Sequence, residues 1–377
     1  MYSIEDYIDS LIEKTKENLD FPAWNIEKKR QGVKSEWNYI DGCMIKAILE
    51  MYSITGDRHY FDFADEYISY RVSDIGEIAG YNWEKFNLDD INAGKTLFEL
   101  YDLTGKEKYK KAMDQIYQQI LLQPRTREGI FWHKLIYPSQ VWLDGLYMCQ
   151  PFYIKYETRF NNKKNYPDIF SQFFKVHDIL RDPKTGLYYH AYDSSRVMYW
   201  SDKETGLSEN FWLRALGWYA MALLDTLTEI DKTGYEAEYN MLKDIYVEFM
   251  EAMCSFQDES GMWWQLPAFP GRERNYLETS GSAIMAYSLL KGTRLGLLPE
   301  RFVENGKRAF HGICKRSLKT ENDTISLDNI CLVAGLGGKQ RRNGTYDYYM
   351  SEPVVKDDAK GVGPFLLAYS EILRLEK

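Results

Sequence analysis

Hydrophobic and polar residues alternate along this chain in a repeated two-part pattern. In the stretches 37–70 and 88–120, a Gly stands near the start of an apolar run, a Thr-Gly pair ends the run, and a segment with one charged face follows. An apolar run such as 215–224 predicts a helix that is buried on most sides, whereas 57–72 predicts a helix with one exposed face. The Thr-Gly pairs are typical of helix ends, because Gly readily adopts the left-handed cap conformation.

The two-part pattern occurs six times and is marked by Gly42, Gly94, Gly145, Gly217, Gly281 and Gly363. The polar-faced stretch 3–18 has no apolar partner before it, and the apolar stretch 361–375 has no polar-faced partner after it. Pairing these two end stretches would close the repeats into a ring. The length alone would allow two domains. The repeat instead predicts an all-α fold, an (α/α)6 barrel of six inner and six outer helices that forms one domain over residues 1–377.

The segments that lead from an outer helix to the next inner helix are long and aromatic. Three of them share a pattern, with "GIFWH" at 129–133, "GLYYH" at 186–190 and "GMWWQ" at 261–265. A Gly followed by apolar and aromatic residues predicts a short β-hairpin arm. All three arms should project where the inner helices begin, and function is usually placed on such loops. We therefore expect the pocket at this mouth of the ring.

Composition excludes several classes of protein. Hydrophobic residues make up 45% and charged residues 27%, as in globular proteins, and the net charge is −9. No basic run suggests nucleic-acid or membrane binding, and no apolar stretch of about 18 residues could span a bilayer. The start of the chain predicts an amphipathic helix rather than a signal peptide. Aromatic residues, at 15%, would suit a site for sugar rings.

The cysteines and histidines give no sign of a metal site. The five cysteines lack metal-ligand spacing, which favours free thiols in a reducing cytoplasm. The five histidines contain no close pair of ligands. We expect no metal and no cofactor, and the sequence leaves open whether the protein is a monomer or a homodimer.

Two carboxylates are predicted at the mouth. Asp144 falls in the first turn of the third inner helix and Asp89 in that of the second. Either could be only a helix cap. Asp90 is one residue out of phase and is expected to cap or to face outward. A helix N-terminus lowers the pKa of a carboxyl by less than about one unit, whereas an apolar wall and a neighbouring carboxylate raise it by several. Asp144 is therefore predicted to be protonated near neutral pH.

Basic and aromatic residues surround these carboxylates in the predicted ring. Arg214 lies within an apolar inner helix and needs an anion, either a protein carboxylate or a substrate carboxylate. The Trp residues at 142 and 218 could belong to the core or stack on sugars, and for Trp212 the core is favoured. Lys134 could bind an anionic group or be solvated. The other candidates are His133 and His190, which occupy matching positions in two arms.

Together the motifs resemble a known family. The stretches "NLDDINAG", "HKLIYPSQVWLDGLYM", "FWLRALGW" and "GLGGKQRRNGTYDYYMSEPVVKDDAKGVGPF" are similar to the unsaturated rhamnogalacturonyl hydrolases of glycoside hydrolase family 105, and the likeness covers essentially the whole chain. The resemblance implies the same barrel. It also implies a small oligosaccharide substrate that carries, at its non-reducing end, the 4,5-unsaturated uronic acid left by pectin lyases.

The resemblance also implies roles for individual residues. By this match Asp144 is the general acid and base, and Asp89 is a second essential carboxylate. A longer insertion at residues 317–358 could alter the choice of leaving sugar, which the sequence does not fix. The matched pocket positions are His133, His190, Arg214, Trp142, Trp218 and, at the first inner helix, Tyr39.

The chemistry that the resemblance implies needs one acid. In a 4,5-unsaturated uronate the ring oxygen and the double bond meet at C5, so a proton delivered to C4 forms an oxocarbenium ion at C5. Water then adds at C5, and the hemiketal opens and releases the leaving sugar.

Two alternatives stay open, since fold alone does not settle function. One is a sugar 2-epimerase with paired histidines, and the other is a non-catalytic carbohydrate-binding protein.

Overall fold

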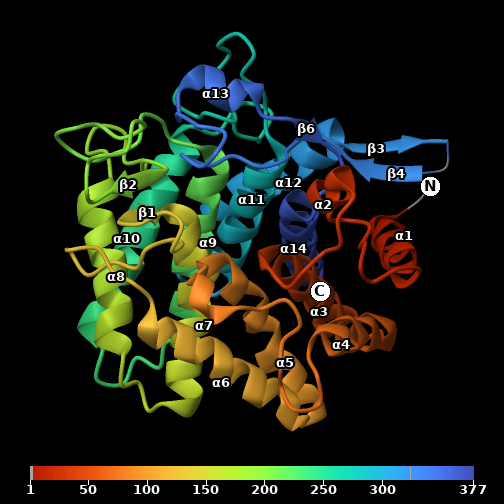
Figure 1. Cartoon of the computed structure of the whole chain (residues 1–377). Helices are drawn as coiled ribbons and strands as arrows, with labels where there is room; N and C mark the ends of the chain where they lie inside the picture. The colour runs from red at the N-terminus through yellow and green to blue at the C-terminus, as the bar shows by residue number, and fades with distance from the viewer. Residues whose placement is uncertain (1–2, 323) are drawn as a thin grey trace.

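Inner and outer helices alternate around a ring in the computed structural model, which describes residues 3–322 and 324–377 (Figure 1). The inner helices are α3 (Tyr39–Thr55), α5 (Lys95–Thr104), α7 (Leu143–Phe160), α9 (Leu213–Glu229), α11 (Thr279–Arg294) and α14 (Ala359–Leu375). The outer helices are α1 (Ile4–Lys16), α4 (Arg58–Arg71), α6 (Glu107–Leu122), α8 (Tyr166–Leu180), α10 (Glu236–Ser255) and α12 (Phe302–Arg316). The (α/α)6 barrel predicted from the repeats is confirmed.

The ring closes because neighbouring inner helices pack on one another, with the segment Leu88–Gly94 before α5 in contact with both α3 and α7, and α14 packs back on α3. The marker glycines lie where neighbouring inner helices approach most closely. A Cβ atom at Gly363 would be 2.5 Å from the carbonyl oxygen of Cys43, and one at Gly42 would be 2.9 Å from the amide nitrogen of Ala93. At the outer rim the Tyr369 hydroxyl of α14 donates to Glu5 of α1, so the two end stretches pair as predicted.

The second inner position begins differently from the others. A 3-10 helix, η2 (Leu88–Gly94), precedes α5, so Asp89 lies in the first turn of this element but not of an α-helix. The Asn87 side chain caps it by accepting from the amide of Asp89 (3.2 Å). The Asn92 side-chain amide donates to the carbonyl of Tyr39 (3.0 Å) and ties η2 to the start of α3.

Two of the three aromatic arms form minimal hairpins, each a tight turn closed by a single antiparallel bridge. Gly129 and Gly186 adopt φ angles of 89° and 74°, and isolated bridges join the arms at Phe131 and Tyr188. The paired strands come from two different segments, with β1 (Gln140–Trp142) antiparallel to β2 (Ala191–Asp193). The arms are held by the inner helices instead. The amide of Leu88 donates to the carbonyl of His133, and that of Leu143 to the carbonyl of His190, each at 3.1 Å.

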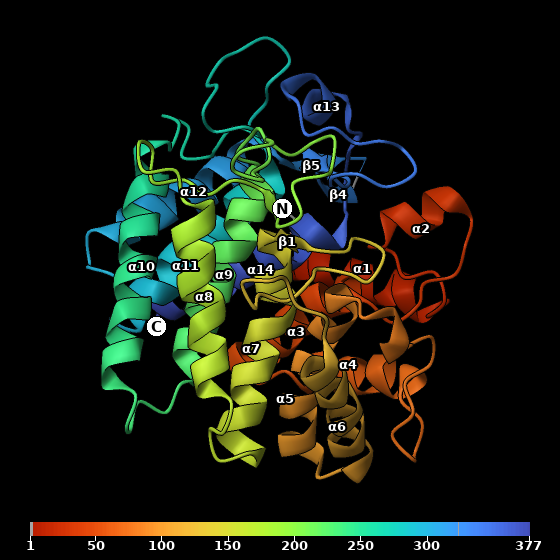
Figure 2. The ribbon, with the colours of Figure 1, turned by 60° about the vertical axis from the view of Figure 1, so that its left-hand side comes forward.

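The remaining elements are short. They are α2 (Ile26–Gln31), the 3-10 helix η1 (Trp83–Lys85), α13 (Tyr346–Ser351), the pair β3 (Leu318–Glu321) and β4 (Thr324–Leu327), and the pair β5 (Ile330–Cys331) and β6 (Val354–Val355). Long loops and α13 gather at one end of the ring, at the top of Figures 1 and 2. Within the described ranges no helix has the length and apolarity needed to cross a bilayer.

Candidate active site

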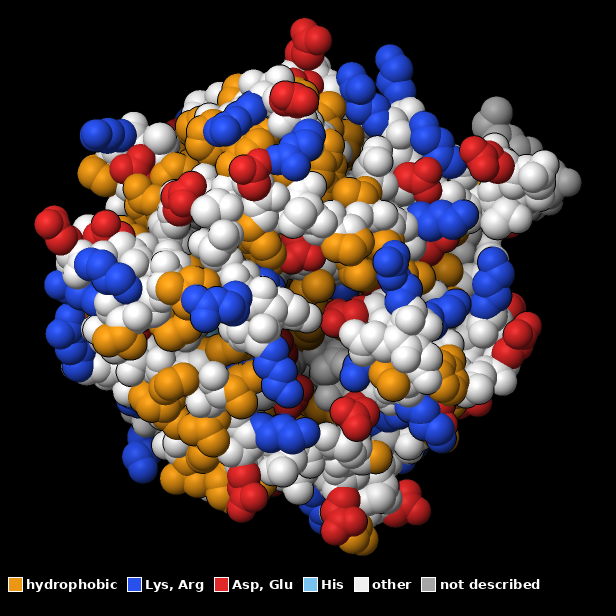
Figure 3. Space-filling model, turned by 45° about the horizontal axis from the view of Figure 1, so that its top comes forward, with side chains coloured by type: hydrophobic (Ala, Val, Ile, Leu, Met, Phe, Trp, Pro, Cys, Tyr) orange, Lys and Arg blue, Asp and Glu red, His pale blue; other side chains and the backbone are white. Residues whose placement is uncertain are grey.

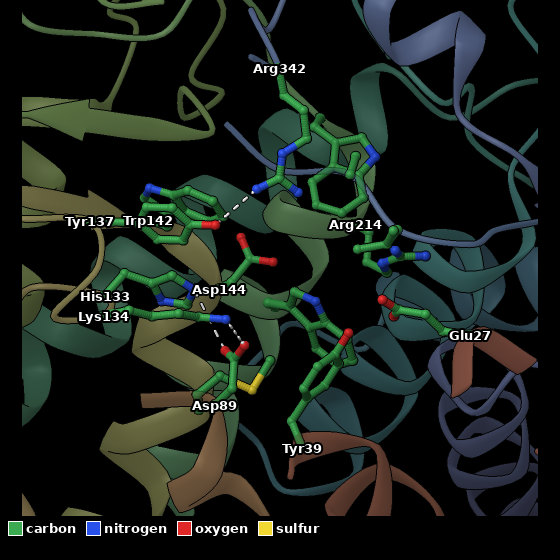
Figure 4. A pocket seen from close by; sticks show the side chains of 15 residues that line it. Glu27, Tyr39, Asp89, His133, Lys134, Tyr137, Trp142, Asp144, Arg214 and Arg342 are labelled. Atoms are coloured by element: carbon green, nitrogen blue, oxygen red, sulfur yellow. Dashed lines mark hydrogen bonds and ion pairs between the residues drawn. The ribbon is translucent and has the colours of Figure 1, made fainter. Parts of the chain in front are cut away.

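A cavity of about 210 Å³ opens at the mouth of the ring, where the inner helices begin. Figure 3 brings this end forward and shows a hollow near the middle of the face, with acidic and basic side chains around it. Of the nine candidate site residues predicted from the sequence, only His190 is absent from the cavity wall. The other eight line it (Figure 4): Asp144, Asp89, His133, Arg214, Trp142, Trp218, Lys134 and Tyr39.

Asp144 projects into the cavity from the first turn of α7, and its Oδ2 faces a histidine. The distance from Oδ2 to Nε2 of the buried His190 is 3.4 Å. Burial acts to raise the pKa of Asp144, but His190, through contact and charge, and then His133 outweigh burial and hold this pKa below its ordinary value. The prediction that Asp144 is protonated in the free protein is therefore wrong.

Asp89 does not act on Asp144 as expected, because its charge is already balanced. Lys134 Nζ lies 2.5 Å from Asp89 Oδ2, and His133 Nε2 lies 3.6 Å from Oδ1. The charge that was expected to raise the pKa of Asp144 acts instead on Asp90, whose pKa is raised to about 7 by burial and then by Asp89.

Asp90 was expected to cap or to face outward, and the outward alternative is wrong. Its side chain is buried, accepts from the side-chain amide of Asn87 at 3.0 Å, and lines a second cavity. The backbone carbonyl of Asp90 accepts from the indole N–H of Trp37 at 2.7 Å. These contacts join η2 to the segment that precedes α3, which a pattern local to η2 could not reveal.

The tryptophans of the wall are already packed against protein rings. Trp142 stacks on His133 with ring centroids 4.7 Å apart and on Tyr137 with centroids 5.0 Å apart. Trp218 stacks on Tyr147 at 5.0 Å. Burial lowers the pKa of His133 to about 4, so this imidazole is neutral near pH 7. This part of the wall is therefore aromatic and carries no charge near pH 7.

Arg214 enters the cavity wall without a carboxylate partner. Its Nη1 donates to Ser280 Oγ (3.1 Å) and to the carbonyl of Cys331, and its Nη2 donates to the carbonyl of Leu332 (3.3 Å). Among the described residues no carboxylate oxygen lies within ion-pair distance of this guanidinium. These contacts leave Nε and part of Nη2 available to an anion, which Arg binds well because its donors form a planar fork.

A second arginine, which the sequence did not predict as a site residue, lines the cavity. Arg342 reaches it from the loop before α13 and donates to Tyr137 Oη (3.1 Å) and to the carbonyl of Gly337 (3.2 Å). A Cβ atom at position 335 would lie 2.6 Å from Arg342 Nη1, so Gly335 makes room for this side chain. The stretch "GLGGKQRRNG" contains the signal, but nothing local to it shows which arginine returns to the barrel.

Other residues were also missed or only partly predicted. Glu27, Tyr137 and Met148 line the cavity. Trp212, for which the core was favoured, is buried and also forms part of the wall. A second cavity of about 240 Å³ shares Glu27, Tyr39 and Asp89 with the first. The two cavities together offer adjoining spaces to a ligand of more than one ring.

The arrangement favours acid–base work on an anionic, oxygen-rich ligand. The first cavity combines the Asp144 carboxylate beside His190, two guanidinium groups that pair with no carboxylate among the described residues, and aromatic walls. Residues 3–322 and 324–377 contain no group of three or more His, Cys, Asp or Glu side chains suited to holding a metal ion.

Comparisons with known proteins point to two glycoside hydrolase families. The model of Glycosyl Hydrolase Family 88 matches residues 12–376. The solved structure of a family 105 glycoside hydrolase from C. acetobutylicum ATCC 824 is 42% identical, covers 98% of this chain and 99% of its own, and superposes with a TM-score of 0.90. The unsaturated rhamnogalacturonyl hydrolase YesR of Bacillus subtilis is 26% identical over 90% of this chain and 91% of its own length. An unsaturated glucuronyl hydrolase from Bacillus sp. GL1, 15% identical with a TM-score of 0.66, shares the fold.

Proposed function

The chain belongs to the glycoside hydrolases of families 88 and 105, and from that membership we propose that it removes a 4,5-unsaturated uronic acid from the non-reducing end of rhamnogalacturonan disaccharides. Membership itself makes the chain a glycoside hydrolase of unsaturated uronides that acts on a small oligosaccharide. The rhamnogalacturonan substrate is the further step, and it is supported by the likeness to YesR over nearly the full length of both chains.

One observation carries the proposal for this cavity. The Asp144 carboxylate, which lies beside His190, shares the cavity with two guanidinium groups, Arg214 and Arg342, neither of which has a carboxylate partner among the described residues. A charged group in a buried site is energetically costly unless a ligand of opposite charge pairs with it. A substrate with one carboxylate at the ring that reacts supplies the missing anion, and Arg214 is proposed to hold it.

The proposed reaction is hydration of the vinyl ether. Asp144 transfers its proton to C4, and the electron pair of the double bond forms the new C–H bond and leaves an oxocarbenium ion at C5. The Asp144 carboxylate then takes a proton from water as the water oxygen bonds to C5. The hemiketal opens to a 5-keto sugar, and the hemiacetal left at C1 releases the second sugar with its own oxygen.

The lowered pKa of Asp144 in the free cavity has a consequence for this reaction. The acid form is required at the start, so the substrate must favour protonation as it binds. A substrate carboxylate brings a negative charge, and its ring displaces water, and both changes raise the pKa of a neighbouring carboxyl. Asp89 then has a different task from the one expected, which is to hold Lys134 and the His133 imidazole at the cavity wall.

The two alternatives are weaker. An epimerase with paired histidines would need both imidazoles at the substrate, but His190 is not part of the cavity wall. A non-catalytic sugar-binding protein would not need a carboxylate held beside a buried histidine. A single domain over residues 1–377, a cytoplasmic location and a monomeric or homodimeric state stay predictions.

The test is turnover of an unsaturated rhamnogalacturonan disaccharide, followed by the loss of ultraviolet absorbance from the conjugated double bond. We expect absorbance to fall as rhamnose is released. Unsaturated disaccharides that end in galactose or glucosamine serve as comparisons. Turnover of these with no turnover of the rhamnose compound would contradict the proposed leaving sugar, and no loss of absorbance with any of them would contradict the proposed reaction.

A further inference from the structure

Behind Asp144, two buried polar atoms face each other without completing a hydrogen bond. They are Oδ2 of Asp144 and Nε2 of His190, which lie 3.4 Å apart, and neither has a hydrogen-bond partner in the part of the chain that the structure describes. Catalytic hydrogen bonds are often long in unliganded structures and shorten when substrate binds. What this contact does depends on which nitrogen of His190 carries the proton, because only Nε2–H can donate to the carboxylate.

The other nitrogen of His190 contacts a tyrosine from the last segment of the chain. The distance from Nδ1 to the Tyr349 hydroxyl is 2.7 Å, and Tyr349 is fully buried on α13. The His190 ring is also held between rings, with its centroid 4.8 Å from that of Trp212 and 5.6 Å from that of Trp142. The imidazole therefore has two polar contacts, one at each nitrogen, and little freedom to turn.

Only one tautomer satisfies all these groups. If Nδ1 carried the proton, it would donate to the Tyr349 oxygen. The tyrosine hydrogen would then lack an acceptor, because within the described residues this hydroxyl has no other hydrogen-bond partner. Nε2 would also present a lone pair to a carboxylate oxygen. Leaving buried polar groups without hydrogen-bond partners is unfavourable. With the proton on Nε2, Tyr349 donates to Nδ1 and His190 donates to Asp144.

We propose that Tyr349 is a positioning residue for the reaction: its hydroxyl donates to Nδ1 of His190 and so keeps the imidazole proton on Nε2, facing Oδ2 of Asp144. Oδ2 then accepts from His190 in both states of the carboxyl group, and the proton that Asp144 transfers lies on Oδ1. In the opposite tautomer Asp144 would donate its proton to Nε2 and not to the substrate. A residue of α13 therefore orients the group that acts as the acid, although α13 lies far along the chain from Asp144.

The inference rests on the proposed function for its kinetic consequence but not for its structural test. With five histidines in the chain, ¹⁵N-histidine spectra can resolve each imidazole, and loss of one signal in His190→Gln assigns it. We expect the His190 spectrum of the wild type to show a proton on Nε2 and none on Nδ1. A wild-type spectrum with the proton on Nδ1 overturns the proposal, whatever the substrate proves to be.

Tyr349→Phe removes the hydroxyl and keeps the ring that packs on Trp212. One hydrogen bond of about 0.5–1.5 kcal/mol corresponds to a two- to tenfold shift of the tautomer ratio toward Nδ1–H. We expect kcat to fall in proportion to the fraction of His190 that loses its Nε2 proton, which the same spectrum measures. KM should stay within about twofold, because Tyr349 is not part of the cavity wall. An unchanged His190 signal, or an unchanged kcat in a folded variant, contradicts the positioning role.

Tyr346→Phe is the matched control on the same helix, because that hydroxyl donates to the carbonyl of Glu273 (2.6 Å) and not to a histidine. It should leave the His190 signal and kcat as in the wild type. If the wild type does not turn over unsaturated disaccharides, the proposed function fails while the tautomer assignment stands on the spectrum. If the wild type turns over unsaturated disaccharides but Tyr349→Phe changes neither the His190 signal nor kcat, only the positioning role fails.

Discussion

Replacing Asp90 by Asn should stabilise the protein at neutral and alkaline pH. Burial, followed by the charge of Asp89, raises the pKa of the Asp90 carboxyl from 3.8 to about 7. At about 1.4 kcal/mol per pKa unit, this rise corresponds to ~4 kcal/mol of stability lost once Asp90 ionises in the folded chain. An Asn at this position keeps a carbonyl oxygen for the Asn87 amide and carries no charge.

The sign follows from the protons that each state binds. Between the unfolded pKa of 3.8 and the folded pKa of about 7, the folded chain holds a proton on Asp90 that the unfolded chain has lost. The contribution of Asp90 to stability therefore falls as pH rises through this window and then levels off. Asp90→Asn lacks this fall. We expect the variant to match the wild type near pH 4 and to exceed it by about 2–4 kcal/mol near pH 8.

Urea denaturation followed by circular dichroism at acidic, neutral and alkaline pH measures this difference. Asp74→Asn is the control, because the Asp74 side chain is fully exposed. It should change stability by less than about 0.5 kcal/mol at every pH. A gain for Asp90→Asn that is the same at all pH values, or no gain in alkali, would refute the reasoning, because either result would mean that the ionised carboxylate costs nothing in this position.

Three further predictions concern the cavity. Asp144→Asn should fold normally and lower kcat by at least about a hundredfold, measured by loss of the double bond, because the amide has no transferable proton; near-normal turnover would make Asp144 only a helix cap. For the wild type, kcat/KM should fall with rising pH, by up to about tenfold per unit, because the lowered pKa of Asp144 leaves less of the acid form; a flat profile through neutral pH would contradict this. Arg342→Ala should raise KM about tenfold or more with little change in stability against urea. Arg214→Lys should raise KM and also lower this stability, because Arg214 donates to Ser280 and to two backbone carbonyls. Equal losses of stability in the two variants would contradict this difference.

The ring could be predicted because its cause is local. Gly42 and Gly363 mark the repeats in the sequence for the same reason that they are needed in the structure, which is the close approach of neighbouring inner helices. Asp144 and Asp89 could also be placed, since each precedes a marker glycine, Gly145 or Gly94, near the start of an inner helix. The single-bridge arms were less predictable, because the carbonyls of His133 and His190 bind inner helices and not a partner strand.

The electrostatics of the site could not be predicted in the same way. The state of Asp144 depends on His190 and that of Asp89 on Lys134, and both pairs form between segments that the fold brings together. Spacing in the sequence showed that two carboxylates face one cavity but not that each has its own basic neighbour. Arg342 was missed for a related reason, because only the return of the last segment over the mouth brings it to the wall.

The central claim is that Asp144 protonates C4 and water adds at C5, and the most direct measurement is the reaction of an unsaturated disaccharide in D₂O, followed by NMR from the first turnovers. The account predicts that the vinyl proton signal disappears at the same rate as the leaving sugar is released, and that deuterium enters at C4 of the uronate product. Release of the leaving sugar with the double bond still present and no deuterium at C4 would contradict it, because the enzyme would then cleave the glycosidic bond directly at C1.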